Sequence, residues 1–414
     1  MYLTAEEKAM LSGEYGPGIK RCMEILVKVG KASGADRMVR INSAHVMPKE
    51  PPDLLAELTE GVSDLGVSFC SQHALMSAFD PEHWEAMGVP RSYALEELKL
   101  RDQRLDIYKR VGFYQTNTCL PMLVGNLPLT GDHVSWIGSC AQILVNSILG
   151  ARTNRDGTVV NLASAITGCT PYVGLHLDEN RYAKVVVEFE DEIDTENLTH
   201  ADLGAIGYYV GRIAGNRNVA FNGLPETLDI DQMKYLMAPL STSGSVSICH
   251  ILGLTPEAST LEEATGGNEP EEVILISKKN IEDTKAIYDL QDNEEVDLVI
   301  LGCPHVTIQE MRTISQMIEG RVVQQGKRLW LGMPYMVYEL AKEMGYSQAV
   351  EEAGGIVSSS CMACIPDCPL PEDTKVVATN SFKAAHYVYA LTKGKVKAVI
   401  RNTEDCLGLV CRDA

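Results

Sequence analysis

The sequence predicts an α/β protein whose C-terminal third is a doubly wound parallel sheet. In that third, short continuous apolar runs alternate with helical patterns, and a strand buried on both faces of a sheet has such an apolar run. The length supports the same class, because 414 residues predict two or three domains at about 150 residues each.

The N-terminal part begins with a predicted helix over residues 1–30, interrupted around Gly13–Gly18. Thr4 and Glu7 have the spacing of a capping box, in which each side chain bonds the other residue's backbone. Strand and helix patterns then alternate through the middle of the chain, which favours α/β over segregated classes. The first of these elements are a strand at 38–47, a helix at 52–65 and a strand at 67–70.

The C-terminal domain is expected to start after a linker rich in Gly, Glu and Pro at 266–272. Its predicted strands are 272–277, 296–301, 328–332, 355–359, 375–380 and 397–400. Its predicted helices are 280–290, 308–318, 334–353, 381–390 and 403–410. We therefore expect an N-terminal region at 1–125, a central region at 126–271 and this domain at 272–414.

Charge and motifs exclude several classes of function. The 36 basic against 56 acidic residues give a net charge of −20, which disfavours nucleic acid and anionic membranes as partners. The polar, acidic N-terminus is no signal peptide, and no apolar run approaches a membrane span, so we expect a cytoplasmic protein. Neither G-x-G-x-x-G nor G-x-S-x-G occurs, which disfavours nucleotide binding and serine hydrolysis. Gly207, Gly211 and Gly215 recur every four residues and predict close helix packing.

The twelve cysteines indicate metal binding or catalysis before disulfides in a reducing compartment, although most are expected to be small buried hydrophobes. Two sets of cysteines are candidates for metal binding. Cys361, Cys364 and Cys368 form a local C-x₂-C-x₃-C cluster. Alternatively, Cys119, Cys303 and Cys361 come from separate segments, and three thiolates can hold an iron–sulfur cluster that leaves one iron open as a Lewis acid.

Position in the predicted sheet favours some of these residues. Cys303, Cys361 and the Thr379–Ser381 group each follow a predicted strand. Ligands bind outside the carboxyl ends of the strands in open α/β sheets. These residues are therefore expected at one edge of the sheet, where a site would form.

The chain resembles the aconitase X family, specifically the separate large subunit of its two-subunit members, essentially from end to end. The longest matching stretch is Asn146–Arg155 (NSILGARTNR). The other stretches that carry the resemblance are Met1–Thr4, Gly13–Gly16, Ser43–His45, Thr118–Pro121, Thr242–Gly244, Gly302–His305, Ser360–Met362 and Thr379–Tyr387.

The resemblance implies an aconitase-like body of three α/β domains around an iron–sulfur site, with Cys119, Cys303 and Cys361 as ligands. A [4Fe-4S] cluster with one open iron is expected, and other iron centres exist in the family. In aconitase-like enzymes the base is a serine on a small swivelling domain. Because that domain is absent from this chain, the serine is expected on a separate small subunit, and the chain alone should be inactive.

The resemblance also implies roles for individual side chains around a small anionic hydroxy-acid substrate. The substrate contacts are expected at Ser43, His45, Asn146, Ser147, Arg152, Thr153, Asn154, Thr242, Ser243 and Asn380. The catalytic groups are expected at Ser381, Lys383, His305 and His386, where either histidine could pass a proton to the departing hydroxide.

Two dehydration activities of the family stay open. The run Arg152–Gly157 and the run Gly174–Arg181 favour (R)-5-phosphomevalonate, converted to trans-anhydromevalonate 5-phosphate. The alternative substrate is cis-3-hydroxy-L-proline, the other dehydration activity of the family. Residues 72–77 and 158–161 depart from the phosphomevalonate pattern, which leaves the choice of substrate open. A non-catalytic protein that holds zinc or no metal on the same scaffold is the alternative of a different class.

Overall fold

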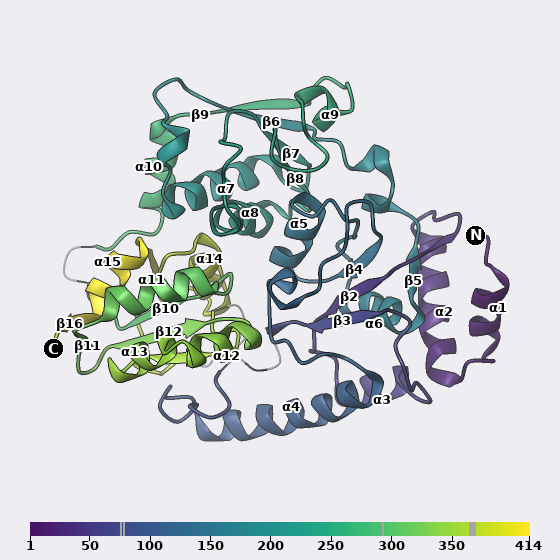
Figure 1. Ribbon diagram of the computed structural model, residues 1–414, viewed down its shortest axis with the longest axis horizontal. Coiled ribbons are helices and arrows are strands. Elements are labelled where there is room, and N and C mark those ends of the chain that lie inside the picture. Colours follow the sequence, from purple (N-terminus) through teal and green to yellow (C-terminus); the bar gives the residue numbers. More distant parts are fainter. Residues whose placement is uncertain (75–76, 78, 292–293, 364–369) are drawn as a thin grey trace.

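The computed structural model describes residues 1–414 except 75–76, 78, 292–293 and 364–369. It has three lobes, each built on its own parallel sheet and arranged around a common centre (Figure 1). The α/β class expected from the sequence is confirmed, and the elements below show how the chain reaches the site.

The N-terminal lobe carries a sheet in the order β3-β2-β4. The predicted capping box of Thr4 and Glu7 is present, and the expected interruption separates α1 from α2. The strand expected at 38–47 is two strands, since β1 pairs antiparallel with β5 while β2 is the centre of the parallel sheet. The elements are α1 (Ala5–Ser12), α2 (Pro17–Ala32), β1 (Met38–Arg40), β2 (Ser43–Val46), α3 (Pro52–Leu58), β3 (Phe69–Gln72), α4 (Arg91–Val111), β4 (Val134–Trp136), α5 (Ser139–Ser147), α6 (Thr158–Thr167) and β5 (Cys169–Pro171).

The middle lobe has four parallel strands in the order β8-β7-β6-β9, with α7 and α8 packed against each other in the interior of the molecule. Gly207 and Gly211 permit this contact, because a Cβ at Gly207 would lie 2.0 Å from the Leu236 carbonyl oxygen. Gly215 instead ends α7 at φ 61°, so the packing prediction is wrong there. The elements are β6 (Val185–Phe189), α7 (His200–Ala214), β7 (Val219–Phe221), α8 (Ile230–Gly244), β8 (Cys249–Ile251), α9 (Leu261–Thr265), β9 (Glu272–Ile276) and α10 (Lys278–Ala286).

The C-terminal lobe is the doubly wound sheet that the sequence predicts, in the order β13-β12-β10-β14-β15. The strand order reverses between β10 and β14, and this switch point is where such sheets bind ligands. The single helix expected at 334–353 is two helices, because Gly345 has a φ of 76° between them. The elements are β10 (Leu298–Leu301), α11 (Ile308–Ile318), β11 (Arg321–Val323), β12 (Arg328–Gly332), α12 (Tyr335–Glu343), α13 (Tyr346–Glu352), β13 (Ile356–Ser358), β14 (Val376–Thr379), α14 (Phe382–Leu391), β15 (Lys397–Ile400), α15 (Thr403–Val410) and β16 (Cys411–Asp413).

The sheets cross both boundaries expected from the sequence. β4 lies beyond residue 125 yet pairs with β2, and β9 lies beyond residue 271 yet pairs with β6. A local apolar pattern identifies a strand but not its partner, because pairing depends on contacts far along the chain. The N-terminal lobe therefore runs past residue 125 and the middle lobe past residue 271, and the strand expected at 272–277 belongs to the middle sheet, so the C-terminal sheet begins only at β10.

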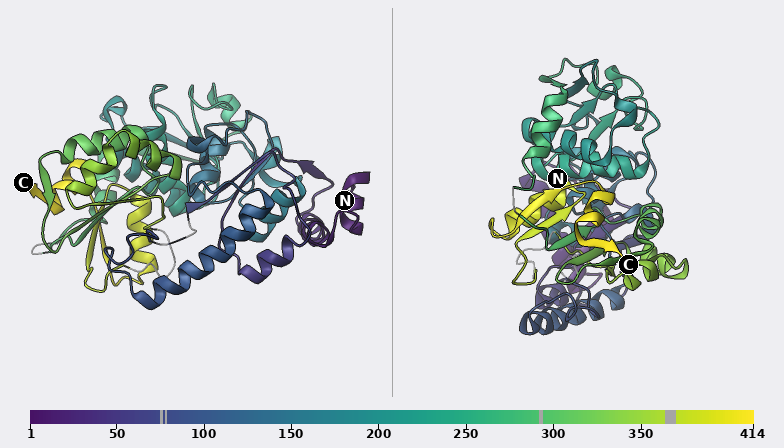
Figure 2. Two further views of the ribbon diagram at one scale, coloured as in Figure 1. Left: turned by 60° about the horizontal axis from the view of Figure 1, so that its bottom comes forward. Right: turned by 90° about the vertical axis from the view of Figure 1, so that its left-hand side faces the viewer.

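One apolar core joins the lobes. It combines the middle sheet with α7, α8 and residues from both other lobes, including Cys119 and Cys303. The α7–α8 pair contacts α5 of the N-terminal lobe and α14 of the C-terminal lobe. The left-hand view of Figure 2 shows the N-terminal and C-terminal lobes at opposite sides of the molecule. In the described part of the chain we find no helix long and apolar enough to cross a membrane.

Candidate active site

The loops that carry the predicted ligands meet where the carboxyl ends of two sheets face each other. Cys303 follows β10 and Cys361 follows β13 in the C-terminal lobe. Cys119 lies in a loop that extends the end of β3, because the Thr118 N–H donates to the Gln72 carbonyl oxygen at 3.1 Å. Predicted residues far apart in sequence thus come to one region.

Cys119 is the best-defined sulfur of this region. It is buried, and its Sγ accepts the backbone N–H of His305 at 3.2 Å. A hydrogen bond from the Cys140 thiol, with smaller contributions from His305 and Lys383, holds the pKa of Cys119 well below its usual range. Burial raises the pKa of Cys140, so Cys119 is the thiol of the pair whose pKa is lowered.

The other two predicted ligands lie against the same core. Cys303 is buried, and its carbonyl oxygen accepts the Ser381 hydroxyl. Cys361 is half-buried and packs on the core cluster that contains Cys119 and Cys303. Cys364 and Cys368, which the alternative grouping uses, lie outside the described residues.

The chemistry of the predicted cysteine ligands fits a cluster that is held by thiolates. Within the described ranges, no three His, Cys, Asp or Glu side chains are close enough to hold a single metal ion. An iron–sulfur cluster spaces its ligands more widely than one ion does, and it is held by cysteine thiolates whose sulfurs accept hydrogen bonds. Cys119, a buried thiol with a lowered pKa whose sulfur accepts an N–H, has this character.

Buried histidines lie beside the cysteine loops. Both ring nitrogens of His305 and Nε2 of His45 are buried without a hydrogen-bond partner among the described residues. Burial lowers the pKa of His305, and it lowers that of His45 to about 3, so both rings are neutral. His45 Nδ1 pairs with Ser71 Oγ at 2.9 Å, which leaves Nε2 as its unused end.

The sequence prediction missed His73, a buried residue directly after β3. Its ring centroid lies 5.5 Å from that of His45, and burial, His45, Lys383 and His305 all lower its pKa. A signal was available, since His73 follows a strand just as Cys303 does.

The predicted substrate motif at 146–154 is tied into the protein. Asn146 donates to the carbonyl oxygens of Thr153 and Ser247, and its Oδ1 accepts the Thr153 N–H. Ser147 Oγ accepts the Cys249 N–H, and Asn154 Nδ2 donates to the Val173 carbonyl oxygen. These side chains hold the loop in place, and a substrate contact for them stays a prediction.

The two arginines of the motif differ. Arg152 pairs with Asp178 and donates to the His176 carbonyl oxygen at 3.1 Å. Arg155 is exposed, has no carboxylate partner in the described ranges, and only approaches Ser241 Oγ at 3.5 Å. Desolvation by neighbouring atoms lowers the pKa of Arg155, and Tyr387 lies near enough to influence it.

Most of the remaining predicted residues form hydrogen bonds within the protein, and Lys383 lies near the cysteine loops. Ser43 Oγ accepts the Trp136 indole N–H at 3.1 Å, and the hydroxyls of Thr242 and Ser243 bond backbone carbonyls within α8 and across to α7. Asn380 donates to Tyr235 Oη, and His386 Nδ1 lies 3.0 Å from Tyr208 Oη. Lys383 is buried on the first turn of α14 and influences the pKa of Cys119.

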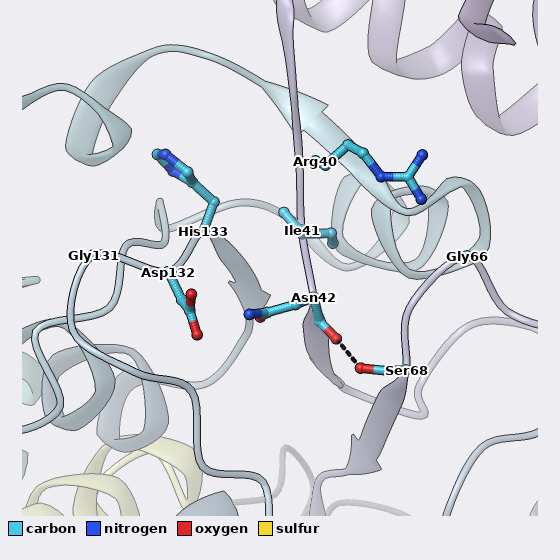
Figure 3. Close-up of a pocket in the computed structure, with 8 residues that line it drawn as sticks. All are labelled: Arg40, Ile41, Asn42, Gly66, Ser68, Gly131, Asp132 and His133. Carbon is cyan, nitrogen blue, oxygen red and sulfur yellow. Dashed lines mark hydrogen bonds between the residues drawn. The ribbon is translucent and has the colours of Figure 1, made fainter.

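Two cavities differ in their relation to these loops. One of about 450 Å³ lies at the amino ends of β2, β3 and β4, away from the cysteines, and is lined by Arg40, Ile41, Asn42, Gly66, Ser68, Gly131, Asp132 and His133 (Figure 3). A second, of about 230 Å³, includes Asn117 and Ser360, which stand close before Cys119 and Cys361. The second cavity therefore borders the candidate site.

Comparisons with known proteins agree with the fold. Residues 1–179, 183–286 and 296–412 match the first, second and third domains of aconitase X, respectively. The crystal structure of Thermococcus kodakaraensis aconitase X in its holo-form superimposes with a TM-score of 0.84 at 30% identity, over 99% of this chain and 100% of that chain.

Relatives with assigned names align with most of this chain. The phosphomevalonate dehydratase large subunit of Methanocaldococcus jannaschii is 35% identical over 406 residues, 96% of this chain and 97% of that protein. The cis-3-hydroxy-L-proline dehydratase of Hypocrea jecorina is 30% identical over 397 residues, 94% of this chain but 65% of that protein. The resemblance seen in the sequence is confirmed, and the chain belongs to the aconitase X family.

Proposed function

We propose that the protein is the large subunit of an iron–sulfur-dependent hydro-lyase that dehydrates (R)-5-phosphomevalonate to trans-anhydromevalonate 5-phosphate. The observation that carries the proposal is full-length similarity at 32–35% identity to four relatives named phosphomevalonate dehydratase large subunit. The two relatives named cis-3-hydroxy-L-proline dehydratase are 29–30% identical, and this chain spans 65–68% of their length.

Cys119, Cys303 and Cys361 are the proposed ligands of the cluster. When bound, a cluster with an open iron supplies a Lewis acid that makes the substrate hydroxyl a better leaving group. The chain's own part is to hold the ligands: the Cys140 thiol and the His305 N–H favour the Cys119 thiolate, and Ser381 holds the Cys303 carbonyl.

Dehydration removes a hydroxide and a proton from neighbouring carbons, and the electron pair of the C–H bond becomes the new double bond. Of the two histidines expected beside the departing hydroxide, we assign His305, whose neutral ring is buried at the cysteine loops, to a hydrogen bond with the leaving hydroxyl, rather than His386, which is paired with Tyr208. The base that takes the carbon-bound proton is assigned to a serine of the small subunit.

The anionic group of the substrate is assigned to Arg155. Its guanidinium has no carboxylate partner in the described part of the chain, while Arg152 is already paired with Asp178. Ser241 of α8 and Tyr387 of α14 lie near Arg155, so it stands where the three lobes meet. A guanidinium offers the planar pair of donors that phosphate and carboxylate oxygens accept.

Parallel assays decide between the two substrates. The protein is purified without oxygen, combined with its small subunit and given each substrate, and the anhydro product is measured. We expect water loss from (R)-5-phosphomevalonate at a kcat/KM far above that for cis-3-hydroxy-L-proline. The reverse preference would assign the alternative activity, and inactivity on both by an iron-loaded pair would refute the proposal.

A further inference from the structure

Lys234 of α8 is a fully buried cation outside the cysteine loops. Within the described residues its ammonium forms two hydrogen bonds and one further ion pair. It bonds Glu310, lies 3.1 Å from Asp231 Oδ1, and donates to the His305 carbonyl oxygen at 3.0 Å. We call Lys234, Asp231 and Glu310 the buried charge cluster.

The cluster connects the middle lobe to the loop that carries a proposed ligand. The loop Cys303–His305 is held at both ends, since Ser381 bonds the Cys303 carbonyl and Lys234 bonds the His305 carbonyl. Between these bonds, the His305 N–H points at Cys119 Sγ, 3.2 Å away. Lys234 therefore fixes the peptide group next to the N–H that reaches the thiolate.

Stability alone is a weak reason for this arrangement. Desolvating three charges is costly, and well-packed apolar side chains often replace a buried ion pair with equal or greater stability. A directed bond to one loop carbonyl is something that an apolar side chain cannot supply.

The surrounding hydrogen bonds extend to the other side of the switch point. Thr307 donates to Asp231 at 2.9 Å, and Tyr235 donates to Glu310 at 2.9 Å. Asn380, directly after β14, donates to Tyr235 Oη at 2.7 Å. The network thus reaches the segments that follow both β10 and β14.

We propose that Lys234 is a positioning residue for the cluster-binding loop: through the His305 carbonyl it holds Cys303 and the His305 N–H in the geometry that the cluster requires. This inference rests on the proposed function, because it takes Cys303 and Cys119 as ligands. Groups beyond the direct ligands that orient them commonly affect metal affinity by about 10- to 100-fold when removed.

The test compares two variants of the full chain. Lys234→Met alone would leave two buried carboxylates uncompensated, so the informative variant is Lys234→Met with Glu310→Gln, which keeps the net charge of the cluster. Glu310→Gln alone is the matched control, because it leaves the Lys234 bond to His305 in place. Lys285→Met, which breaks the ion pair with Asp202 near the surface, controls for the loss of a lysine.

Two quantities are measured after anaerobic purification: iron retained against a chelator, and hydrogen exchange of the backbone over 303–307 in the metal-free protein. We expect the double variant to hold iron about 10- to 100-fold more weakly and to exchange faster over this segment, while both controls match the wild type. A folded double variant with wild-type iron retention and exchange overturns the inference. A wild-type chain that binds no iron overturns the proposed function instead, and unchanged exchange in the double variant still rejects the positioning role.

Discussion

Arg152 and Arg155 are three positions apart on one loop, but their guanidinium groups have different partners. The guanidinium of Arg152 is held by Asp178 and the His176 carbonyl, so it supports the loop. Arg155 keeps its donors available beside Ser241, at the junction of the lobes. The sequence alone favours Arg152 as the anion contact. It does not show which arginine already has a partner, because the partners come from segments far along the chain.

Replacing these arginines separates the two roles. Arg155→Gln should lower kcat/KM by about 10- to 100-fold with little change in stability, since a bond to a charged group is lost. Arg152→Gln should mainly lower the free energy of unfolding. Steady-state kinetics and urea unfolding of both variants check this. A larger kinetic defect in Arg152→Gln would show that Arg152 binds the anion, as the sequence predicts.

His176 makes stability depend on pH in a definite direction. Burial, with smaller contributions from His133, Arg181 and Arg152, lowers its pKa to about 3, so the ring is neutral in the folded chain. The unfolded chain binds a proton below about pH 6.5. The contribution of His176 is therefore complete above pH 6.5 and is lost as pH falls towards 3, by up to about 1.4 kcal/mol per pH unit.

His176→Gln should make the free energy of unfolding less steep between about pH 6 and pH 4. Urea titrations at a series of pH values measure that slope, and His83→Gln, which changes an exposed histidine, is the control. Equal slopes in wild type and His176→Gln would contradict the assignment.

At the scale of elements, the close contact of α7 and α8 leaves no room for a side chain at Gly207. Gly207→Ala would place a Cβ 2.0 Å from the Leu236 carbonyl oxygen, so the helices must separate. We expect it to cost about 1–3 kcal/mol of stability. Gly408→Ala on α15 has open space and should stabilise by up to about 1 kcal/mol. Thermal unfolding compares the two, and equal melting temperatures would refute the packing argument.

Elements were predictable where a local pattern decides them. The capping box before α1 and the strands β10, β12, β13, β14 and β15 follow from short runs of sequence. Two features could not be predicted from such runs. The break between α12 and α13 depends on the backbone angle at Gly345, and the pairing of β9 with β6 depends on a distant strand. His73 could have been found from its place after β3, but its contact with His45 required the sheet.

At the scale of the whole molecule, three lobes with parallel sheets surround a common centre, and the proposed serine base would come from a small subunit. Relatives of nearly the same length are named large subunits. We expect the iron-loaded chain to be nearly inactive by itself and to gain activity on titration with the small subunit, saturating at a fixed ratio. Full activity of the isolated chain would contradict this account.

The central claim is that Cys119, Cys303 and Cys361 hold the iron–sulfur cluster, and iron and sulfide per chain after anaerobic purification test it most directly. Each of the three Cys→Ser variants should lose most of its iron, while Cys249→Ser, at a buried cysteine on β8, should keep the wild-type amount. The account is contradicted if Cys119→Ser keeps its iron and Cys364→Ser loses it, since the cluster would then belong to the local cysteine group.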